Sequence, residues 1–511
     1  IPIKVEISDG SIRVSKEFNF TITVPRPAIG EVFKHVNPDS VAENKLKVGV
    51  LMVDSTGGNA SFSGRPSTYN EYISPEALGE LVFKSENGLN SFLQEASYGR
   101  TSLEGSVIGW GIIESQTEGS QFDNLKGQKK VQAAVKLLEG QVDLEDALTA
   151  LDVIVVYTRE SISGNRSSHS TLEVDDQIKL AGLPEVSSLK WLLFENGDLE
   201  LDNGDIPSGP DMVLPSANWA IEFLTQMGIK GKADALFPDS SDINSALVLH
   251  SLPEGANPYS IMGSPHWAVH PDLGMKISLG WLKDGEFSQV NKDGNYRIST
   301  LESAINLSVD GVPDFKGAVI ELPFPYTFSN KSGEKIETKR LFVEYRDATG
   351  FDAILESKLE DSEQLNTYTS LETVNRRGLL VYASYPDSNN GSALQSTVLL
   401  DIHPGTPLTE VSASNTMYRA FGELSDAFLN LNEEFTLKNP DAGESVEDLV
   451  ITVSSLADDF SWIEFSVSGI ESQSSDQGRA IAKMSGSGAS SGGLKTLLIT
   501  KDIDITSSED N

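Results

Sequence analysis

Apolar and polar positions alternate through the first two dozen residues of the chain. Two alternating runs flank Ser8-Asp9-Gly10-Ser11, a segment that contains an Asp-Gly turn signal. The apolar positions are Ile3, Val5 and Ile7 before the turn and Phe18, Phe20, Ile22 and Val24 after it. Alternation with a period of two is typical of strands, and a short Asp-Gly connection is typical of hairpins. The pattern therefore predicts an N-terminal β-hairpin.

From about residue 45 to 283 the pattern changes to a mixture of continuous apolar runs and helical periodicity. The runs at 47–53 and 151–157 predict buried strands, because a strand covered on both faces loses its alternation. The stretches 75–96, 127–150 and 215–229 have the composition and spacing of helices. This part of the chain therefore predicts a mixed α/β domain.

From about residue 284 onward the pattern predicts strands and turns. The predicted strands are 339–345, 378–383, 396–402 and 446–454, with Asp-Gly turn signals at 284–285, 293–294 and 310–311. We expect a β-sandwich packed behind the α/β domain. Residues 472–493 are rich in Ser and Gly, which is typical of a flexible linker, and 494–506 predict one further strand.

The fold class expected from these patterns is mixed α+β, in four segments. Residues 1–29 form the hairpin, which is either the end of an upstream immunoglobulin-like module or a β-arm packed on the main body. Residues 30–283 form the α/β domain, residues 284–471 the β-sandwich, and residues 472–511 the linker and terminal strand. We expect the chain to be a mature form or a fragment of a longer precursor.

Charge and composition exclude several classes of partner. The chain has 39 basic and 75 acidic residues among 511, a formal net charge of −36. Such a charge repels nucleic acid and anionic membrane surfaces. The chain contains no Cys, which excludes disulfides and Cys-based metal centres. It also has no apolar run long enough for a transmembrane helix, so we expect no membrane insertion.

Residues 219–229 carry the most informative motif, Trp-Ala-Ile-Glu-Phe-Leu-Thr-Gln-Met-Gly-Ile. In the zinc helix H-E-x-x-H-x-x-G, two histidines one turn apart bind the metal and the glutamate is the general base. Here Ile221 and Thr225 stand at the histidine positions, while Glu222 and Gly228 remain in register. Neither Ile nor Thr supplies an imidazole nitrogen. The segment therefore resembles a zinc helix without its ligands.

Other segments occur in the order found in one family of peptidases. They are 48–54, Ser97-Tyr98-Gly99 with Leu103, Gly105, Val107, Gly109 and Trp110, 151–157, Tyr259-Ser260-Ile261-Met262-Gly263, His270-Pro271 with Lys276 and Leu279-Gly280-Trp281, Val343-Glu344-Tyr345-Arg346 with Gly350-Phe351-Asp352, and 378–381. Together they resemble the secreted bacterial metallopeptidases of the immune inhibitor A family, over roughly residues 45–470. The resemblance implies a metzincin-like α/β peptidase-type domain followed by a β-sandwich domain, with Met262 in the methionine turn.

The departure from the family lies at the catalytic centre. The third ligand of such sites falls six residues after the second, at Gly231, and Asp234 is three residues further along. We therefore expect no catalytic zinc, and Glu222 then has no metal-bound water to deprotonate. The alternative is an active metallopeptidase or hydrolase with a relocated metal site. Its candidate zinc ligands are His266, His270 and Asp234, although Pro271 disfavours a regular helix at His270.

One acidic segment is a candidate calcium site. Its carboxylates are Asp198, Glu200, Asp202 and Asp205, close to Asn203 and Gly204. Oxygen ligands at this density suit Ca²⁺. The spacing is not that of an EF-hand, and a solvated acidic hairpin is the alternative reading.

These observations favour a catalytically inactive peptidase-like module of a secreted or surface bacterial protein, extracellular in location. Its partners would be a protein or glycan ligand, or neighbouring modules of the same protein. A structural subunit of a surface array is a further alternative. A binding role predicts a cleft lined by exposed aromatic side chains at Trp219, Tyr259 and Trp267, whereas a structural role predicts that these side chains are covered.

Overall fold

The structure is a computed structural model, and it describes the following residues. They are 2–8, 13–19, 33–35, 44–55, 75–86, 88–138, 151–159, 190–194, 216–227, 229, 233–238, 247–250, 257–263, 269–306, 312–330, 333–347, 349–353, 377–385, 396–403, 424–439 and 447–470. Over these residues the fold is mixed α+β, as the sequence predicts. No helix among them is both long and apolar enough to cross a membrane.

The N-terminal hairpin is confirmed. Strands β1 (Pro2–Ser8) and β2 (Arg13–Asn19) pair antiparallel, in register from Pro2↔Asn19 to Ser8↔Arg13. Among the described residues the hairpin forms a two-stranded sheet of its own.

A five-stranded sheet forms the centre of the α/β part, a name we use for this sheet and helices α1 to α4 and α6. Its order is β3 (Phe33–His35), β5 (Thr101–Ile112), β4 (Asn44–Asp54), β6 (Val153–Arg159) and β7 (Lys190–Phe194). The last four are parallel, and β3 is antiparallel to β5. Gly105 lets β5 approach β4 closely, since a Cβ there would lie 1.7 Å from the Val48 carbonyl oxygen.

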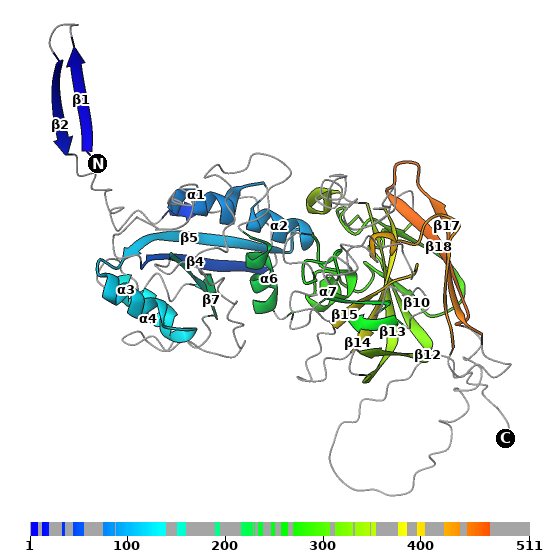
Figure 1. Cartoon of the computed structure of the whole chain (residues 1–511). Coiled ribbons are helices and arrows are strands. Elements are labelled where there is room, and N and C mark those ends of the chain that lie inside the picture. Colours follow the sequence, from blue (N-terminus) through cyan, green and yellow to red (C-terminus); the bar gives the residue numbers. More distant parts are fainter. Residues whose placement is uncertain are drawn as a thin grey trace, which may run out of the picture.

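Helices cover both faces of this sheet. Figure 1 shows α1 (Pro75–Gly79) and α2 (Leu89–Ala96) on one side of β4 and β5, and α3 (Gln116–Asp123) and α4 (Gln128–Leu138) on the other. A π-helical turn, η2 (Glu80–Lys84), lies between α1 and α2. Strand β4 is buried from both sides because Val48, Val50 and Met52 join one apolar core and Leu51 and Val53 join the other. Burial on both faces accounts for its continuous apolar run.

A seven-stranded sheet begins the β part, which also contains helix α7 (Leu273–Ser278). Its order is β10 (Ser288–Val290), β12 (Ala318–Asn330), β13 (Lys335–Arg346), β14 (Gly378–Tyr385), β15 (Ser396–Leu400), β8 (Ala233–Pro238) and β9 (Leu247–His250). Strand β12 changes register between Glu321 and Tyr326, and its far end pairs with β9. This additional pairing closes β12, β13, β14, β15, β8 and β9 into a ring.

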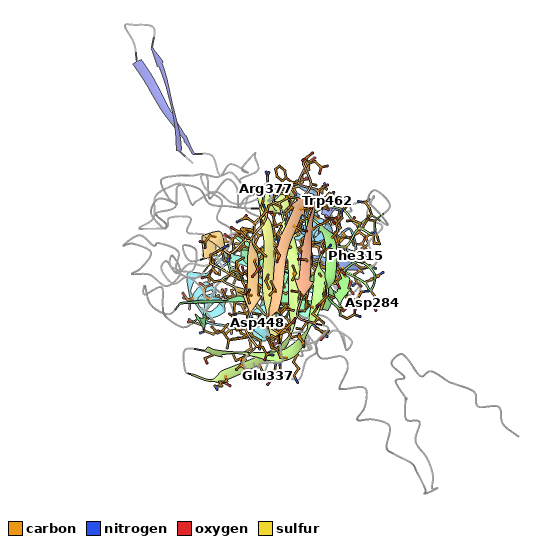
Figure 2. The ribbon with its side chains drawn as sticks, turned by 90° about the vertical axis from the view of Figure 1, so that its right-hand side faces the viewer. Asp284, Phe315, Glu337, Arg377, Asp448 and Trp462 are labelled. Carbon is orange, nitrogen blue, oxygen red and sulfur yellow. The ribbon has the colours of Figure 1, made fainter. Side chains whose placement is uncertain are left out.

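A four-stranded antiparallel sheet completes the β part. Its order is β11 (Gly294–Ser299), β18 (Trp462–Ser468), β17 (Leu449–Leu456) and β16 (Glu434–Leu437). Its inward residues share one apolar core with the seven-stranded sheet. Figure 2 looks onto this side, with Trp462 and Arg377 near one end of the strands and Asp448 near the other. Two short 3-10 turns also belong to the β part, η4 (Gly350–Asp352) and η5 (Leu424–Asp426).

The domain boundary predicted at 283/284 does not coincide with a boundary between sheets. Strands β8 and β9 precede it, yet β8 pairs in parallel with β15 from Ala233↔Thr397 to Leu236↔Leu400. Turn signals in a sequence mark the ends of strands and carry no information about which distant strand becomes the neighbour. The second sheet therefore includes β8 (Ala233–Pro238) and β9 (Leu247–His250) from the segment assigned to the first domain.

Candidate functional site

Helix α6 (Ser216–Gln226) carries the peptidase-like motif and packs as an amphipathic helix. Trp219 is fully buried and its ring stacks on Phe194, with centroids 4.1 Å apart and an interplanar angle of 9°. The motif positions Ile221, Glu222 and Thr225 lie on the half-buried side. The Thr225 hydroxyl donates a 2.8 Å hydrogen bond to the Ile221 carbonyl oxygen, so it is turned toward the helix backbone.

Trp219 and Tyr259, the two described residues among the aromatic side chains that a binding role would leave exposed, are covered, as a structural role predicts. Trp219 and Tyr259 are at most 2% exposed. The Tyr259 hydroxyl donates to the Leu424 carbonyl oxygen at 2.8 Å, and its ring meets Phe428 edge-on at 4.8 Å. Their large apolar surfaces are used in the core of this same chain. Met262, the methionine-turn residue, is also buried.

Several predicted site residues lie outside the described residues, so the structure does not place them. They are Gly228, Gly231, His266, Trp267 and the candidate calcium ligands Asp198, Glu200, Asp202 and Asp205. Asp234 is described and lies buried in β8, in register with Val398. Within the described part of the chain, no three His, Asp or Glu side chains are grouped so as to hold a metal ion.

The densest concentration of ionisable groups lies between α2, α7 and β13, and we refer to it as the buried charge network. Its members are Glu95, Tyr98, His270, Asp272, Lys276, Glu302, Glu344, Arg346, Asp352 and Tyr382. Most are completely shielded from solvent. Burying so many charges is costly unless each is paired and hydrogen-bonded.

Arg346 lies at the centre of the network, at the end of β13. Its Nε donates to Glu344 Oε1 at 2.8 Å, and its Nη1 contacts Asp352 Oδ2. Its Nη2 donates to the carbonyl oxygens of His270 and Pro271, each at 3.4 Å. Burial alone would lower the pKa of Arg346, but the two carboxylates outweigh burial and raise it. The guanidinium therefore remains charged.

His270 uses its backbone and both ring nitrogens. Its backbone N–H donates to Asp352 Oδ1 at 2.7 Å. Its Nε2 lies 3.1 Å from Glu95 Oε1, and its Nδ1 lies 3.4 Å from Lys276 Nζ. Burial, with the Lys276 charge as the second cause, lowers the pKa of His270. We therefore assign a neutral ring with its proton on Nε2. In this arrangement both ring nitrogens face side chains of the chain itself, whereas the relocated zinc site considered above would need one of them to be free.

Lys276 lies in α7 and is fully buried. Its Nζ donates to the Tyr98 hydroxyl at 3.2 Å and lies 4.4 Å from the centroid of that ring. Burial and the nearby Arg346 charge lower the pKa of Lys276 to about 7. Tyr98 has a left-handed backbone with φ of 57°, which is uncommon for an aromatic residue. Its hydroxyl donates to the Leu301 carbonyl oxygen at 2.7 Å, which anchors the strained residue to the β part.

The carboxyl groups of the network differ in their protonation. Burial raises the pKa of Asp272 to about 6, with the Glu344 charge adding to the effect. Burial and the adjacent Asp352 carboxylate raise the pKa of Glu302 well above its usual value. Burial would also raise the pKa of Asp352, but Arg346 outweighs it and holds that pKa well below the usual range. Glu302 accepts the Asp347 N–H through its Oε1 at 3.3 Å, so one oxygen of this buried side chain is engaged by the backbone.

Four members of the network, Glu95, Asp272, Glu302 and Tyr382, were not singled out by the sequence patterns. Asp272 caps α7 by accepting the Met275 N–H at 3.1 Å, and it also accepts the Thr397 hydroxyl at 2.7 Å. An Asp just before a helical stretch is a recognisable N-cap signal. Glu95 and Glu302 carry no comparable local signal, because their partners lie far away in the sequence.

Comparison of the chain with protein-family models finds no match, and comparison with curated proteins finds none either. The resemblance to immune inhibitor A therefore depends on the quoted segments. The structure brings several of these segments together in the buried charge network, namely Ser97-Tyr98-Gly99, His270-Pro271 with Lys276, Glu344 with Arg346, and Asp352. The solvent-shielded members of this group hold segments of the protein together.

Proposed function

We propose that the chain is a catalytically inactive, metallopeptidase-like module of a secreted or surface bacterial protein, with a role in binding or assembly. The observation that carries the proposal is helix α6. Ile221 and Thr225 occupy the positions where zinc ligands are needed, and the Thr225 hydroxyl is bonded to the Ile221 carbonyl oxygen. Neither side chain supplies the neutral imidazole that such a site requires.

In this proposal the five-stranded sheet with α2 and α6 is the metzincin-like domain, and the two sheets of the β part are the β-sandwich. Peptide hydrolysis by a zinc peptidase needs a metal-bound water for the glutamate to activate. Without those ligands Glu222 keeps only the role of a polar residue on an amphipathic helix. The ligand would be a protein or glycan, and calcium at 198–205 remains part of the proposal.

A second candidate is a structural subunit of a surface array. One observation favours it, namely that Trp219 and Tyr259 are covered by the chain's own core. A binding cleft at this position would need such aromatic surfaces to face a ligand. Both candidates share the absence of peptidase chemistry, and they differ in whether the chain associates with itself or with a separate ligand.

The first experiment compares hydrolysis of unfolded protein substrates by the wild-type chain and by Glu222→Gln, each with added zinc. We expect neither to hydrolyse the substrates. Zinc-dependent hydrolysis by the wild type that is lost in Glu222→Gln would overturn the proposal. Sedimentation over a range of concentrations, with and without calcium, then separates the two candidates. Self-association supports the array subunit, whereas a monomer retained by particular glycans or proteins supports the binding module.

A further inference from the structure

Three side chains of the buried charge network form a continuous chain across the junction between the α/β part and the β part. Glu95 belongs to α2 of the α/β part, whereas His270 and Lys276 belong to the β part. Glu95 Oε1 lies 3.1 Å from His270 Nε2, and His270 Nδ1 lies 3.4 Å from Lys276 Nζ. The Glu95 side chain is 33% exposed, whereas that of His270 is fully buried. Glu95 therefore connects the buried pair to solvent.

The hydrogen bonds of this chain require a neutral imidazole. A neutral ring with its proton on Nε2 donates to the Glu95 carboxylate and accepts at Nδ1 from the Lys276 ammonium. A second proton on the ring would have to sit on Nδ1, which faces Lys276 Nζ at 3.4 Å. Two donors would then face each other, and two positive charges would lie in contact away from water.

We propose that the Glu95–His270–Lys276 chain is an acid-sensitive joint, in which protonation of His270 loosens the contact between the α/β part and the β part. This inference does not depend on the proposed function, because it rests on the contacts of the junction alone. It assigns to the buried charge network a conformational role in addition to its structural one.

The groups around His270 act in opposite directions. Two cations oppose protonation of His270. They are Lys276 of α7 and Arg346 of β13, which donates to the His270 carbonyl oxygen. Two carboxylates favour protonation of His270, namely Glu95 of α2 and Asp352 of η4. Phe92 of α2 meets the imidazole edge-on at 6.2 Å, and Tyr98 lies beyond Lys276.

The cations that oppose protonation of His270 outweigh the carboxylates that favour it, for two physical reasons. Glu95 is partly exposed, so solvent screens its attraction for an imidazolium, and the charge of Asp352 is already engaged by Arg346. Lys276, in contrast, is fully buried and takes up its proton near pH 7, so a proton that later arrives at His270 meets a cation. The lowered pKa of His270, caused by burial first and Lys276 second, agrees with this balance.

The direction of the pH effect follows from the two states. In the unfolded or opened chain a histidine has a pKa of about 6.5, whereas in the closed joint the pKa of His270 is lower. The open state therefore binds the proton more readily, and the closed joint loses stability as the pH falls below 6.5. Above that pH His270 is neutral in both states and contributes no pH dependence.

Other contacts across the junction keep the two parts attached at mildly acidic pH. Arg100 pairs with Glu286 at 2.7 Å, and Trp281 Nε1 donates to Thr101 Oγ1 at 2.9 Å. Burial would raise the pKa of Glu286, but its hydrogen bonds to Arg100 and the Lys283 backbone lower it, so it stays charged. We therefore expect acid to loosen the segments at the joint and not to separate the two parts.

Hydrogen exchange of the full chain at pH 7.5 and pH 5.0, corrected for intrinsic rates, tests the proposal. In the wild type, segments 89–96 and 349–353 should exchange faster at pH 5.0, by a factor of up to about 30, which is the limit that an open-state pKa of about 6.5 sets. His270→Gln is neutral at both pH values and keeps a donor for Glu95, so it should lose this acceleration. The matched control, His403→Gln, changes a half-exposed histidine of the β part and should behave as the wild type. Equal acid acceleration in His270→Gln would overturn the proposal.

A measurement on the unchanged protein covers the case in which His270→Gln fails to fold. The slow exchange of the imidazole C2 hydrogen, followed by mass spectrometry of the peptide that contains His270, reports the pKa of that ring. We expect a value below that of an exposed histidine, and one closer to ordinary in Lys276→Met. A pKa for His270 at or above 6.5 in the wild type would contradict the joint.

Discussion

Helix α6 and the buried charge network both contain residues that sequence patterns singled out, and they are built in opposite ways. In α6 the motif positions Ile221, Glu222 and Thr225 are half-buried on one side of an amphipathic helix. In the network, Arg346 and Asp352 are fully buried and each bonds several partners. A half-buried helical side tolerates replacement, whereas an interlocked set of buried charges does not. A sequence pattern carried by the network is therefore harder to lose by substitution than one carried by the half-buried side of α6.

The largest expected effect comes from removing one charge of the network. In Asp352→Asn the Arg346 guanidinium loses a buried carboxylate, and only one side-chain oxygen remains for the Arg346 guanidinium and the His270 N–H, which now bond to separate oxygens. Breaking a buried ion pair in this way costs about 3–5 kcal/mol. Denaturant unfolding should show a loss of that size. Asp448→Asn is the control, because Asp448 pairs with an exposed lysine; it should leave the free energy of unfolding nearly unchanged. An equal loss of unfolding free energy in the two variants would mean that the buried ion pairs of the network stabilise the fold no more than an exposed pair does.

The next largest effect concerns how steeply the free energy of unfolding changes with pH. Folded Lys276 has a pKa of about 7 against about 10.4 when unfolded, so between these values the unfolded state binds one more proton. Stability from this group therefore rises with pH, by up to about 1.4 kcal/mol per pH unit. Lys276→Met should remove this part of the slope. Urea unfolding at pH 7, 8 and 9 measures it, and parallel slopes for the two proteins would contradict the buried-lysine assignment.

A smaller effect is expected for Trp219→Phe in α6. The Phe ring can keep the contact with Phe194, and the Trp219 indole N–H has no hydrogen-bond partner among the described residues. Replacing one large apolar ring by another typically costs less than about 1.5 kcal/mol. Thermal unfolding should show a modest decrease in Tm. A large loss of affinity for a glycan or protein ligand in this variant, with its stability unchanged, would show that Trp219 takes part in ligand recognition.

The smallest effect is expected at Thr225, which stands where the zinc-helix motif has its second histidine. Its hydroxyl bonds to the carbonyl oxygen of its own helix, an interaction that competes with helical geometry. Thr225→Ala should change the free energy of unfolding by less than about 0.5 kcal/mol, since alanine is the better helix former. A loss of several kcal/mol would show that Thr225 supports the core in a way that its half-buried position does not indicate.

Much of the secondary structure could be predicted from local patterns. The run at 47–53 lies within β4, the run at 151–157 overlaps β6 from residue 153, and the stretch 215–229 contains α6. The stretch predicted as one helix at 75–96 is divided into α1, a π-helical turn and α2, with Ser85 in an extended conformation between them. Helical spacing alone does not reveal that interruption.

The candidate site was less predictable, because its contacts join residues far apart in sequence. His270, Lys276 and Arg346 were noticed as landmarks, but nothing local indicates that Glu95 accepts the Phe351 N–H at 2.8 Å. The sequence left open whether Trp219 and Tyr259 line an exposed cleft or are covered, because an aromatic residue looks the same in sequence whether it faces solvent or a second layer. Only the stacking of Trp219 on Phe194 decides between these cases.

The pairing of β8 with β15 also affects how the chain can be synthesised. Strand β8 ends at Pro238, but its partner β15 spans 396–400. A ribosome must therefore add the intervening residues before this side of β8 can be covered, and such long-range pairing is slow and prone to misassembly. A premature stop before residue 396 would release a polypeptide whose β8 edge stays open to strands of other molecules. Nascent chains of this protein would accordingly benefit from a chaperone that shields residues 233–238 until synthesis has passed residue 400.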